Sequence, residues 1–281
     1  MVPLLLVDGH NLLWRAWFGF PARIHSRDKR RDLTGVFGFF ALLRVAVREL
    51  PGPPEIAVVF DGEHAWDTRT RLDPAYKAHR RTDADAMAPI RALADVTRGL
   101  ELLAIRQVCI DTAEADDVIA TLARRSRRPH RREVWIMSTD RDFYQLVDPW
   151  TRILNTARHP GHRIIDHSAI ERRHGVRADR WCDRVSLVGD PSDGIRGVYG
   201  VGPITAARLL AGHLAVEQLP GSGRLTGAVG ARIRREFPNV LRCKQLARLR
   251  SDIAVPQRIL TGHPNATLPP APAVLDRLDL W

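Results

Sequence analysis

The chain has 281 residues, of which 44% are hydrophobic and 27% charged, a composition typical of a folded globular protein with a substantial core. Its net charge of +11 is typical of proteins that bind nucleic acid. The three cysteines are widely spaced, which excludes a disulfide framework and a structural zinc site, and no apolar stretch is long enough to cross a membrane. We therefore expect a cytoplasmic protein that does not contact a membrane.

Short apolar runs alternate with helical patterns through the first half of the chain. Strands are predicted at 4–7, 56–60, 105–110 and 134–137, and helices at 34–50, 90–103, 143–146 and directly after the third strand. Strands that alternate with helices are typical of βαβ units. The sequence therefore predicts an α/β fold, in which a mainly parallel central sheet has helices on both faces.

Acidic residues follow three of these strands at the point where each strand ends. Asp8, Asp61 and Asp140 each come after the last apolar residues of a strand. Because the carboxyl ends of parallel strands meet at one edge of a sheet, we expect the three side chains to share one crevice. A single acid after a strand commonly stabilises a turn, but acids after three separate strands are not readily explained in that way.

The helix after the third strand begins with EADD, which places Glu114, Asp116 and Asp117 at its start. One or two acids there would complement the helix dipole and cap free N–H groups, and Asp111 or Thr112 is a further candidate for the cap. A third acid is harder to explain by capping, because clustered like charges repel each other unless a cation neutralises them. The cluster alone fits capping and metal binding equally well, and the acids at the strand ends favour metal binding.

Nine carboxylates are candidates for this metal site, two of them from the second half of the chain. They are Asp8, Asp61, Glu114, Asp116, Asp117, Asp140, Asp142, Asp190 and Asp193. Oxygen ligands without histidine or cysteine select hard cations such as Mg²⁺ or Mn²⁺. So many carboxylates exceed the needs of one ion, whereas two ions about 4 Å apart suit phosphodiester hydrolysis.

The second half of the chain has a different pattern. After short edge strands at 152–154 and 163–165, helices are predicted at 181–188, 203–210, 227–237 and 238–250, and about 25 final residues are expected to be extended or flexible. We divide the chain into an α/β core over 1–165, a helical part over 166–260 and a C-terminal tail over 261–281.

A glycine-rich turn, Gly200-Val201-Gly202, precedes the helix that begins at Pro203. Such a turn lets main-chain N–H groups approach a phosphate closely. It is a weak signal alone, but in a chain of this charge it predicts a clamp on the duplex backbone over about 195–212.

The segment 62–89 combines cations with aromatic residues and shows no sustained apolar period. It contains Arg69, Arg71, Lys77, Arg80 and Arg81 together with Trp66 and Tyr76. Cations contact phosphates and aromatic faces stack on bases, which suits single-stranded nucleic acid. A solvated surface loop is the alternative, but the segment's length and its place after Asp61 favour a gate. The arginine run over 124–132 is expected at the opposite pole of the sheet, without a role in catalysis.

Several motifs, in this order, resemble the bacterial 5′ nuclease family, which includes the N-terminal nuclease domain of DNA polymerase I, stand-alone flap endonucleases and phage 5′-exonucleases. They are LLLVDGHNLLWRAWFGFP, VVFDG, YKAHR, EADDVIATLA, STDRDFYQLV and GDPSDGIRGVYGVGPITAARLL. The resemblance covers roughly residues 1–260 and implies a metal-dependent enzyme that removes 5′ flaps and degrades DNA or RNA from 5′ ends.

The resemblance also implies roles for individual residues. The nine carboxylates would hold two or three metal ions, with Asp8, Asp61, Glu114 and Asp116 at the first ion and Asp117, Asp140, Asp142 and Asp193 at the second. The segment 62–89 matches the family's helical arch, where Arg69, Tyr76, Lys77 and Arg80 bind the scissile phosphate and the strand. Lys77 and Arg69 are the catalytic candidates, and Arg81 is a further DNA-binding candidate.

The Gly200–Pro203 turn resembles the family's helix-turn-helix duplex clamp, which in some members also holds K⁺, and Thr205 and Arg208 are DNA-binding candidates beside it. Two positions depart from the family pattern. Its SDN reads Ser192-Asp193-Gly194 here, and the lysine that commonly follows the turn is Ile204, whose phosphate contact we expect Arg208 to replace.

These features predict a Mg²⁺- or Mn²⁺-dependent 5′ nuclease of replication and repair that acts as a monomer on DNA with 5′ flaps, nicks or 5′ ends, with RNA primers as a further substrate class. Two other readings stay open. One is a catalytically weak protein that binds DNA structures, and the other is a ribonuclease with a related acidic α/β core.

Overall fold

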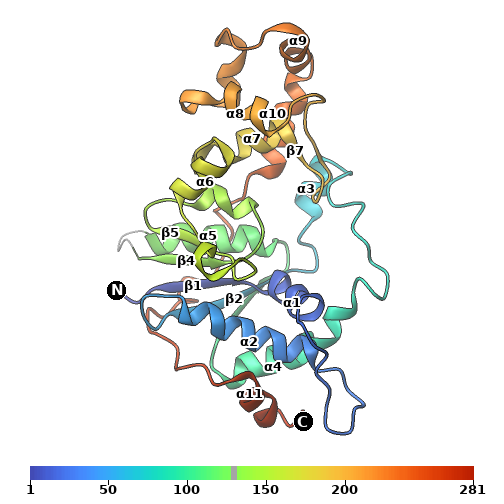
Figure 1. Cartoon of the computed structure of the whole chain (residues 1–281), viewed down its shortest axis with the longest axis vertical. Helices are drawn as coiled ribbons and strands as arrows, with labels where there is room; N and C mark the ends of the chain where they lie inside the picture. The colour runs from blue at the N-terminus through green and yellow to red at the C-terminus, as the bar shows by residue number, and fades with distance from the viewer. Residues whose placement is uncertain (128–131) are drawn as a thin grey trace.

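The computed structural model describes residues 1–127 and 132–281 and places a six-stranded sheet at its centre (Figure 1). The strands lie in the order β3-β2-β1-β4-β5-β6, in which β6 alone is antiparallel to its neighbour. Their bounds are β1 (Leu4–Asp8), β2 (Glu55–Asp61), β3 (Arg106–Ile110), β4 (Val134–Met137), β5 (Thr151–Leu154) and β6 (Ile164–Ile165). The mainly parallel sheet predicted from the sequence is confirmed.

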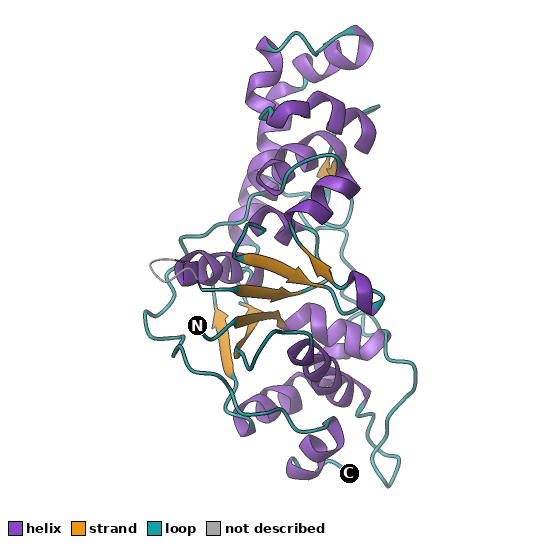
Figure 2. Ribbon diagram, turned by 60° about the vertical axis from the view of Figure 1, so that its left-hand side comes forward, coloured by secondary structure: helices purple, strands orange, loops and turns teal. Residues whose placement is uncertain are grey.

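Helices cover both faces of this sheet, as the turned view in Figure 2 shows. Side chains of a strand alternate between its two faces, so Leu5 and Val7 of β1 belong to one apolar cluster and Leu4 and Leu6 to another. The first cluster packs under α1 (Gly9–Phe18), α2 (Thr34–Arg48), α4 (Leu93–Leu102) and α11 (Ala271–Arg277), and the second under α5 (Ala115–Arg127).

The second half of the chain adds helices beyond the α5 side of the sheet. They are α6 (His167–His174), α7 (Trp181–Val188), α8 (Pro203–Leu209), α9 (Gly227–Arg235) and α10 (Phe237–Ala247). A two-stranded antiparallel hairpin, β7 (Gly189–Asp190) with β8 (Ile195–Arg196), follows α7. Short 3₁₀ helices are η1 (Ala88–Ala92), η2 (Asp142–Leu146), η3 (Pro160–His162), η4 (Ala178–Arg180), η5 (Ala211–His213) and η6 (Val216–Gly221).

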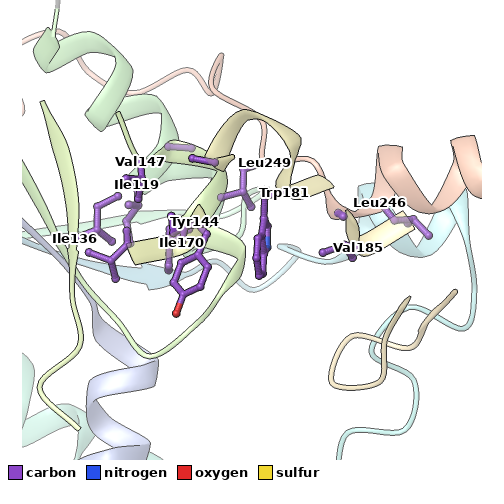
Figure 3. Close-up of a cluster of buried hydrophobic side chains, with 14 of the residues drawn as sticks. Ile119, Ile136, Tyr144, Val147, Ile170, Trp181, Val185, Leu246 and Leu249 are labelled. Carbon is purple, nitrogen blue, oxygen red and sulfur yellow. The ribbon is translucent and has the colours of Figure 1, made fainter. Parts of the chain in front are cut away.

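One continuous apolar cluster joins the sheet to these helices (Figure 3). Ile136 of β4 and Ile119 of α5 lie at one end of it, and Val185 of α7 and Leu246 of α10 at the other, with the fully buried Trp181 between them. Because these groups share one core, the hairpin that follows α7 is held against the carboxyl edge of the sheet.

The structure corrects two local expectations. The carboxylate of Asp61 accepts a hydrogen bond from the main-chain N–H of Ala115 at 2.7 Å, so the cap of α5 comes from β2 rather than from Asp111 or Thr112. The final residues are not all extended: α11 packs against α2 and buries Val274 and Leu275 completely.

The segment 62–89 contains a single α-helix, α3 (Asp67–Leu72), followed by turns that lead into η1. In Figure 1 it runs as a long strap on one side of the molecule, between the sheet and the helical part. The arginine run over 124–132 lies partly outside the described residues, which end at Arg127 and resume at Arg132. Among the described residues, no helix is long and apolar enough to span a membrane.

Candidate active site

Acids from three strands and one helix line a pocket of about 970 Å³ at the carboxyl edge of the sheet. Asp8 ends β1, Asp61 ends β2, Asp140 follows β4, and Asp116 lies in the first turn of α5. The structure therefore brings these four side chains together at one pocket. The opposite wall is formed by the segment 62–89, with Trp66, Lys77, His79, Arg80 and Arg81 among its lining residues.

Asp8 is held at the floor of the pocket by two hydrogen bonds. Its oxygens accept from the main-chain N–H of Asn11 at 3.1 Å and from the Ser138 hydroxyl at 2.9 Å. Burial and the nearby charges of Asp61 and Asp140 nevertheless raise the pKa of Asp8 to about 7. Burial likewise raises the pKa of Asp116 well above its usual range, and Asp8 and Asp140 add to the rise.

A second acidic group stands beside the first, formed by Asp140 and Asp142 after β4 and by Asp190 and Asp193 of the β7–β8 hairpin. Burial raises the pKa of Asp142 well above its usual range, and the charges of Asp140, Asp193 and Asp190 raise it further. Its Oδ1 is buried and has no hydrogen-bond partner in the described part of the chain. Asp193 differs, because Arg80 binds its Oδ1 at 2.8 Å.

Asp61 is the exception among the acids of the first group. Burial alone would raise its pKa, but hydrogen bonds from His10 and from the N–H of Ala115, with the charge of Lys77, bring the pKa below its ordinary value. His10 Nδ1 lies 3.3 Å from Asp61 Oδ2. Asp61 is therefore a carboxylate at neutral pH.

These acids fit a divalent cation. Among the described residues, Asp8, Asp116, Asp140 and Asp142 have no ion pair, although they are largely enclosed and repel one another. Buried carboxylates without a counter-charge are strongly disfavoured, and an orphaned oxygen such as Asp142 Oδ1 lacks a partner that a cation would provide. An oxygen-only set of this kind suits Mg²⁺ or Mn²⁺.

The structure places Glu114 and Asp117 with arginines rather than in the open pocket. Both oxygens of the fully buried Asp117 accept from Arg69, at 2.8 and 2.9 Å, and also from the main-chain N–H and the side chain of Arg250. Glu114 binds Arg69 at 2.6 Å and pairs with Lys77. All lone-pair directions of Asp117 are thus taken, which conflicts with its predicted place at the second ion.

Arg69, predicted as catalytic, is itself enclosed, with 6% of its surface exposed. Besides the two acids it donates to the carbonyl oxygens of Leu246 and Arg248, each at 3.0 Å. Burial lowers its pKa, but hydrogen bonds and charge from Asp117 and Glu114 raise it above the ordinary value. Arg69 therefore ties α3 to α5 and α10, and it does not face the pocket.

Lys77 stands at the base of the segment 62–89 and reaches the pocket. It adopts a left-handed backbone conformation (φ 53°), and its N–H donates to the carbonyl oxygen of Asp193 at 3.0 Å. Burial lowers the pKa of Lys77, but Glu114 and Asp193 raise it above its usual value, so its side chain is an ammonium ion. Tyr76 is buried beneath it and shares Glu114 and Asp193 through its hydroxyl, so its ring is not open to a base.

Arg80 and Arg81 are placed differently. Arg80 combines its bond to Asp193 with a stacked position over Trp66, with 5.7 Å between its guanidinium carbon and the ring centre. Arg81 is exposed and binds Asp83. Arg80 is therefore held at the pocket wall, and Arg81 lies at the exposed rim of the pocket.

The glycine-rich turn lies in the helical part, with Gly200 and Gly202 exposed and Val201 buried; Thr205 is half-buried. Arg208 is exposed in the last turn of α8, at the far end of that helix from the turn. The cation that contacts the turn is Arg232 of α9, which donates to the carbonyl oxygen of Tyr199 at 2.6 Å. Arg208 is exposed one helical turn after Ile204, so its replacement of the missing lysine stays a prediction.

Sequence reasoning missed three residues that shape these sites: Ser138, Asn11 and Arg232. Ser138 lies in the STD stretch after β4, and Asn11 lies in the DGHN stretch at the end of β1; these positions are a signal for residues of the same edge. Asn11 also bonds Thr139 in both directions, which closes the floor of the pocket. No local signal marks Arg232, because it meets the turn only after folding.

Comparison with known proteins agrees with this geometry. The family model described as 5′-3′ exonuclease, N-terminal resolvase-like domain, matches residues 3–175, and the model described as 5′-3′ exonuclease, C-terminal SAM fold, matches residues 176–265. A 5′-3′ exonuclease of Streptomyces coelicolor is 31% identical over 271 residues, which covers 90% of this chain and 87% of that protein.

The thermostable DNA polymerase I of Thermus thermophilus is 36% identical over 216 residues, 77% of this chain. The chain spans about a quarter of the length of that relative. Among solved structures, a flap endonuclease of bacteriophage T5 in complex with DNA and metal ions superimposes with a TM-score of 0.72 at 19% identity, over 99% of each chain. The family models, the identity to the Streptomyces protein and the shared fold lead to one conclusion: the chain belongs to the 5′-3′ exonuclease family.

Proposed function

We propose that the chain is a divalent-metal-dependent 5′ nuclease, which hydrolyses phosphodiesters of DNA at 5′ flaps, nicks and 5′ ends in replication and repair. The observation that carries this proposal is the group of enclosed, unpaired carboxylates that faces the ammonium of Lys77 across the pocket. Carboxylates alone would repel a phosphate, so the group requires a cation, and a bound cation together with Lys77 makes the pocket attractive to one.

Asp8, Asp61 and Asp116 would hold one Mg²⁺ or Mn²⁺, with Glu114 behind them, and Asp140, Asp142, Asp190 and Asp193 a second. When bound, these ions activate water and neutralise charge on the phosphate. We propose that Asp117 positions Arg69 and α5 rather than binding an ion, because its oxygens are occupied by two arginines.

The chain's own cations complete the site. Lys77 is anchored through Glu114 and through its N–H bond to Asp193, so its ammonium has a fixed position from which it can donate to a phosphate oxygen. Arg80 adds a second donor from the stack on Trp66. Arg69 is a positioning residue in this scheme, since it holds Glu114 and thereby Lys77.

The remaining parts of the proposal concern the setting of the reaction. Segment 62–89 would gate access of a single strand, and the turn over 200–203, with Thr205 and Arg232, would bind the duplex backbone and K⁺. RNA primers as substrates follow from the family resemblance. Action as a monomer, a cytoplasmic location and the division of the chain at 165 and 260 belong to the same proposal.

The decisive experiment is cleavage of a 5′-flap duplex labelled at either end, with Mn²⁺ or Mg²⁺ and with EDTA. We expect metal-dependent cleavage that is lost in Asp140→Ala and retained in Asp252→Ala, since Asp252 is exposed and lies outside the pocket. Full-strength binding in EDTA without any turnover in metal would favour the DNA-structure-binding protein instead. Preference for unstructured RNA over flap DNA would favour the ribonuclease.

A further inference from the structure

A cluster of cations outside the acidic pocket has no counter-charge of its own. It surrounds His174 of α6 and contains Arg141, Arg158, Arg173 and Arg184, whose charges all act on that histidine. None of these four arginines has an ion pair with an acid among the described residues. The residues come from α6, α7 and the loops around η2 and η3, so the fold and not the local sequence brings them together.

Arg184 is the central member. Only 9% of its surface is exposed, and its guanidinium carbon lies 5.0 Å from the ring centre of Trp181. Its Nε is buried, with no hydrogen-bond partner among residues 1–127 and 132–281. Asp190 is the one acid that acts on its charge, and Arg141 opposes that effect. A buried N–H donor without a partner is unfavourable, and one stacked ring does not replace the water that Nε has lost.

Among the described residues, the neighbours of Arg184 also lack hydrogen-bond partners or counter-charges. His174 packs against Trp181 and Tyr144, and its Nε2 is also buried without a partner. Arg158 donates to the Tyr144 hydroxyl at 3.3 Å and makes no ion pair with any acid that the structure describes. Two orphaned nitrogens, of Arg184 and His174, and the unpaired Arg158 thus lie around the rings of Trp181 and Tyr144.

We propose that Arg184, Arg141, Arg158 and His174 form a phosphate-binding site separate from the acidic pocket. A phosphate fits because guanidinium groups bind its oxygens through paired N–H donors, and because its negative charge offsets the mutual repulsion of the cluster. Arg141 stands between Asp140 and Asp142 in the sequence, so the site begins at the rim of the acidic pocket. A nucleic acid strand that enters the pocket can therefore also place a phosphate here.

The first test uses inorganic phosphate as the probe, with EDTA present so that the acidic pocket binds no metal. Phosphate should raise the melting temperature of the parent by several degrees, because a ligand that binds only the folded state stabilises it. Arg184→Met should lose this rise, and its melting temperature without phosphate should equal or exceed that of the parent. Arg172→Met is the matched control and should behave as the parent does. Arg172 is an exposed arginine of α6 whose side chain, among the described residues, hydrogen-bonds to Ser168 only.

The opposite result in these melting experiments would refute the proposed phosphate site. If Arg184→Met melts lower than the parent without phosphate and keeps the full phosphate effect, Arg184 is a structural partner of Trp181 and no more. Should Arg184→Met fail to fold, the imidazole of His174 gives a second measurement by NMR. Phosphate binding should raise its pKa from about 4, and an unchanged value in saturating phosphate would contradict the proposal.

The second test identifies the source of the phosphate, and this assignment rests on the proposed function, whereas the first test does not. Duplexes with a 5′-phosphate or a 5′-hydroxyl are bound in EDTA over a range of salt concentrations. If a backbone diester occupies the site, Arg184→Met weakens both duplexes alike and lowers the salt slope by about 1. If a terminal monoester occupies it, the variant weakens the 5′-phosphorylated duplex alone. No loss with either duplex would refute the nucleic-acid assignment even where the first test succeeds.

Discussion

The main-chain N–H of Lys77 donates to the carbonyl oxygen of Asp193 across 3.0 Å, and this bond fixes the base of the segment 62–89 to the β7–β8 hairpin. The same two residues meet again through their side chains, with 4.0 Å between Lys77 Nζ and Asp193 Oδ2. Lys77 holds this place in a left-handed conformation, which is strained for a residue with a side chain and persists only where its surroundings fix it. The ammonium of Lys77 and the second acidic group, to which Asp193 belongs, are therefore held in a fixed arrangement.

Gly194 makes this contact possible, because a Cβ atom there would lie 2.5 Å from the carbonyl oxygen of Ala75. We expect Gly194→Ala to destabilise the fold by about 1–3 kcal/mol and to lower the rate of cleavage, since Ala75, two residues before Lys77, must move. Gly223→Ala is the matched control: its φ is also 73°, but nothing lies within 4 Å of the added carbon. Thermal unfolding and flap cleavage of both variants measure the difference, and equal rates would show that the close approach is unimportant.

Asp116 and Asp117 are neighbours in α5, but Asp116 faces other acids whereas Asp117 pairs with two arginines. Their asparagine variants should therefore change stability and cleavage in opposite ways. Asp116→Asn removes a charge that Asp8 and Asp140 oppose, so it should stabilise the metal-free protein and abolish cleavage. Asp117→Asn breaks buried ion pairs with Arg69 and Arg250, which should destabilise the fold by about 3–5 kcal/mol.

The measurement that separates the two roles is cleavage at saturating Mn²⁺, at a temperature where both variants are folded. Asp117→Asn should then keep most of the activity. If it loses activity as completely as Asp116→Asn while its Mn²⁺ affinity falls equally, Asp117 is a metal ligand after all.

The pKa of Asp8 near 7 predicts an unusual dependence of stability on pH. Between the ordinary value of 3.8 and about 7, folded Asp8 holds a proton that the unfolded chain has released, so the metal-free fold loses stability as pH rises through this window. Mn²⁺ requires the carboxylates without protons, so its binding should strengthen over the same range and reverse the trend. Melting temperatures from pH 5 to 8, with EDTA and with Mn²⁺, test both signs. Asp8→Asn should reduce the slope of the EDTA curve without removing it, because the raised pKa values of Asp116 and Asp142 act in the same direction. Parallel curves with and without Mn²⁺ would contradict the prediction.

The sequence was sufficient for the strands and for the acids that follow them, because each depends on a short apolar run and on the shared edge of a parallel sheet. It was insufficient for Asp117, whose partner Arg250 is 133 residues away. Capping of α5 by Asp61 and the contact of Arg232 with the turn are likewise long-range. No local pattern specifies such a pair, because the same acid fits a cap, an ion pair or a metal site until the fold selects one.

The prediction that the final residues are extended or flexible was wrong for a different reason. Its prolines suggested an extended segment, although Pro270 directly precedes the start of α11 and Pro272 lies in its first turn, where a missing N–H is tolerated. Val274, Leu275 and Leu278 then give the apolar spacing of a short helix, and all three are buried. The signal was present in the sequence, but it was too short to outweigh the proline content.

Arg232 and Arg208 should differ in their effect on duplex binding. Arg232 stacks on Tyr199, with 4.9 Å between its guanidinium carbon and the ring centre, and lies against the glycine-rich turn, whereas Arg208 is at the far end of α8. We expect Arg232→Gln to weaken duplex binding and to lower the salt slope by about 1, and Arg208→Gln to have a smaller effect. Arg234→Gln, from an exposed position of α9, controls for the loss of one charge. Equal losses from all three would mean that the helical part attracts DNA by its overall charge only.

His174 should make the fold sensitive to acid. Burial, followed by the charges of Arg184, Arg141, Arg173 and Arg158, lowers its pKa from 6.5 to about 4. Between these values the unfolded chain binds a proton that the folded chain does not, so His174 removes stability as pH falls from 6.5 towards 4.

His174→Phe should abolish this loss, because a phenyl ring packs between Tyr144 and Trp181 without a nitrogen to satisfy. Relative to the parent, the variant should gain about 1–2 kcal/mol between pH 7 and 4.5, a range reduced for the partial exposure of the ring. Denaturant unfolding at both pH values gives this difference directly, and His263→Phe, at an exposed position, should show none. A gain that is the same at pH 7 and at pH 4.5 would mean that the variant only improves packing, because a lost titration must appear between the two pKa values.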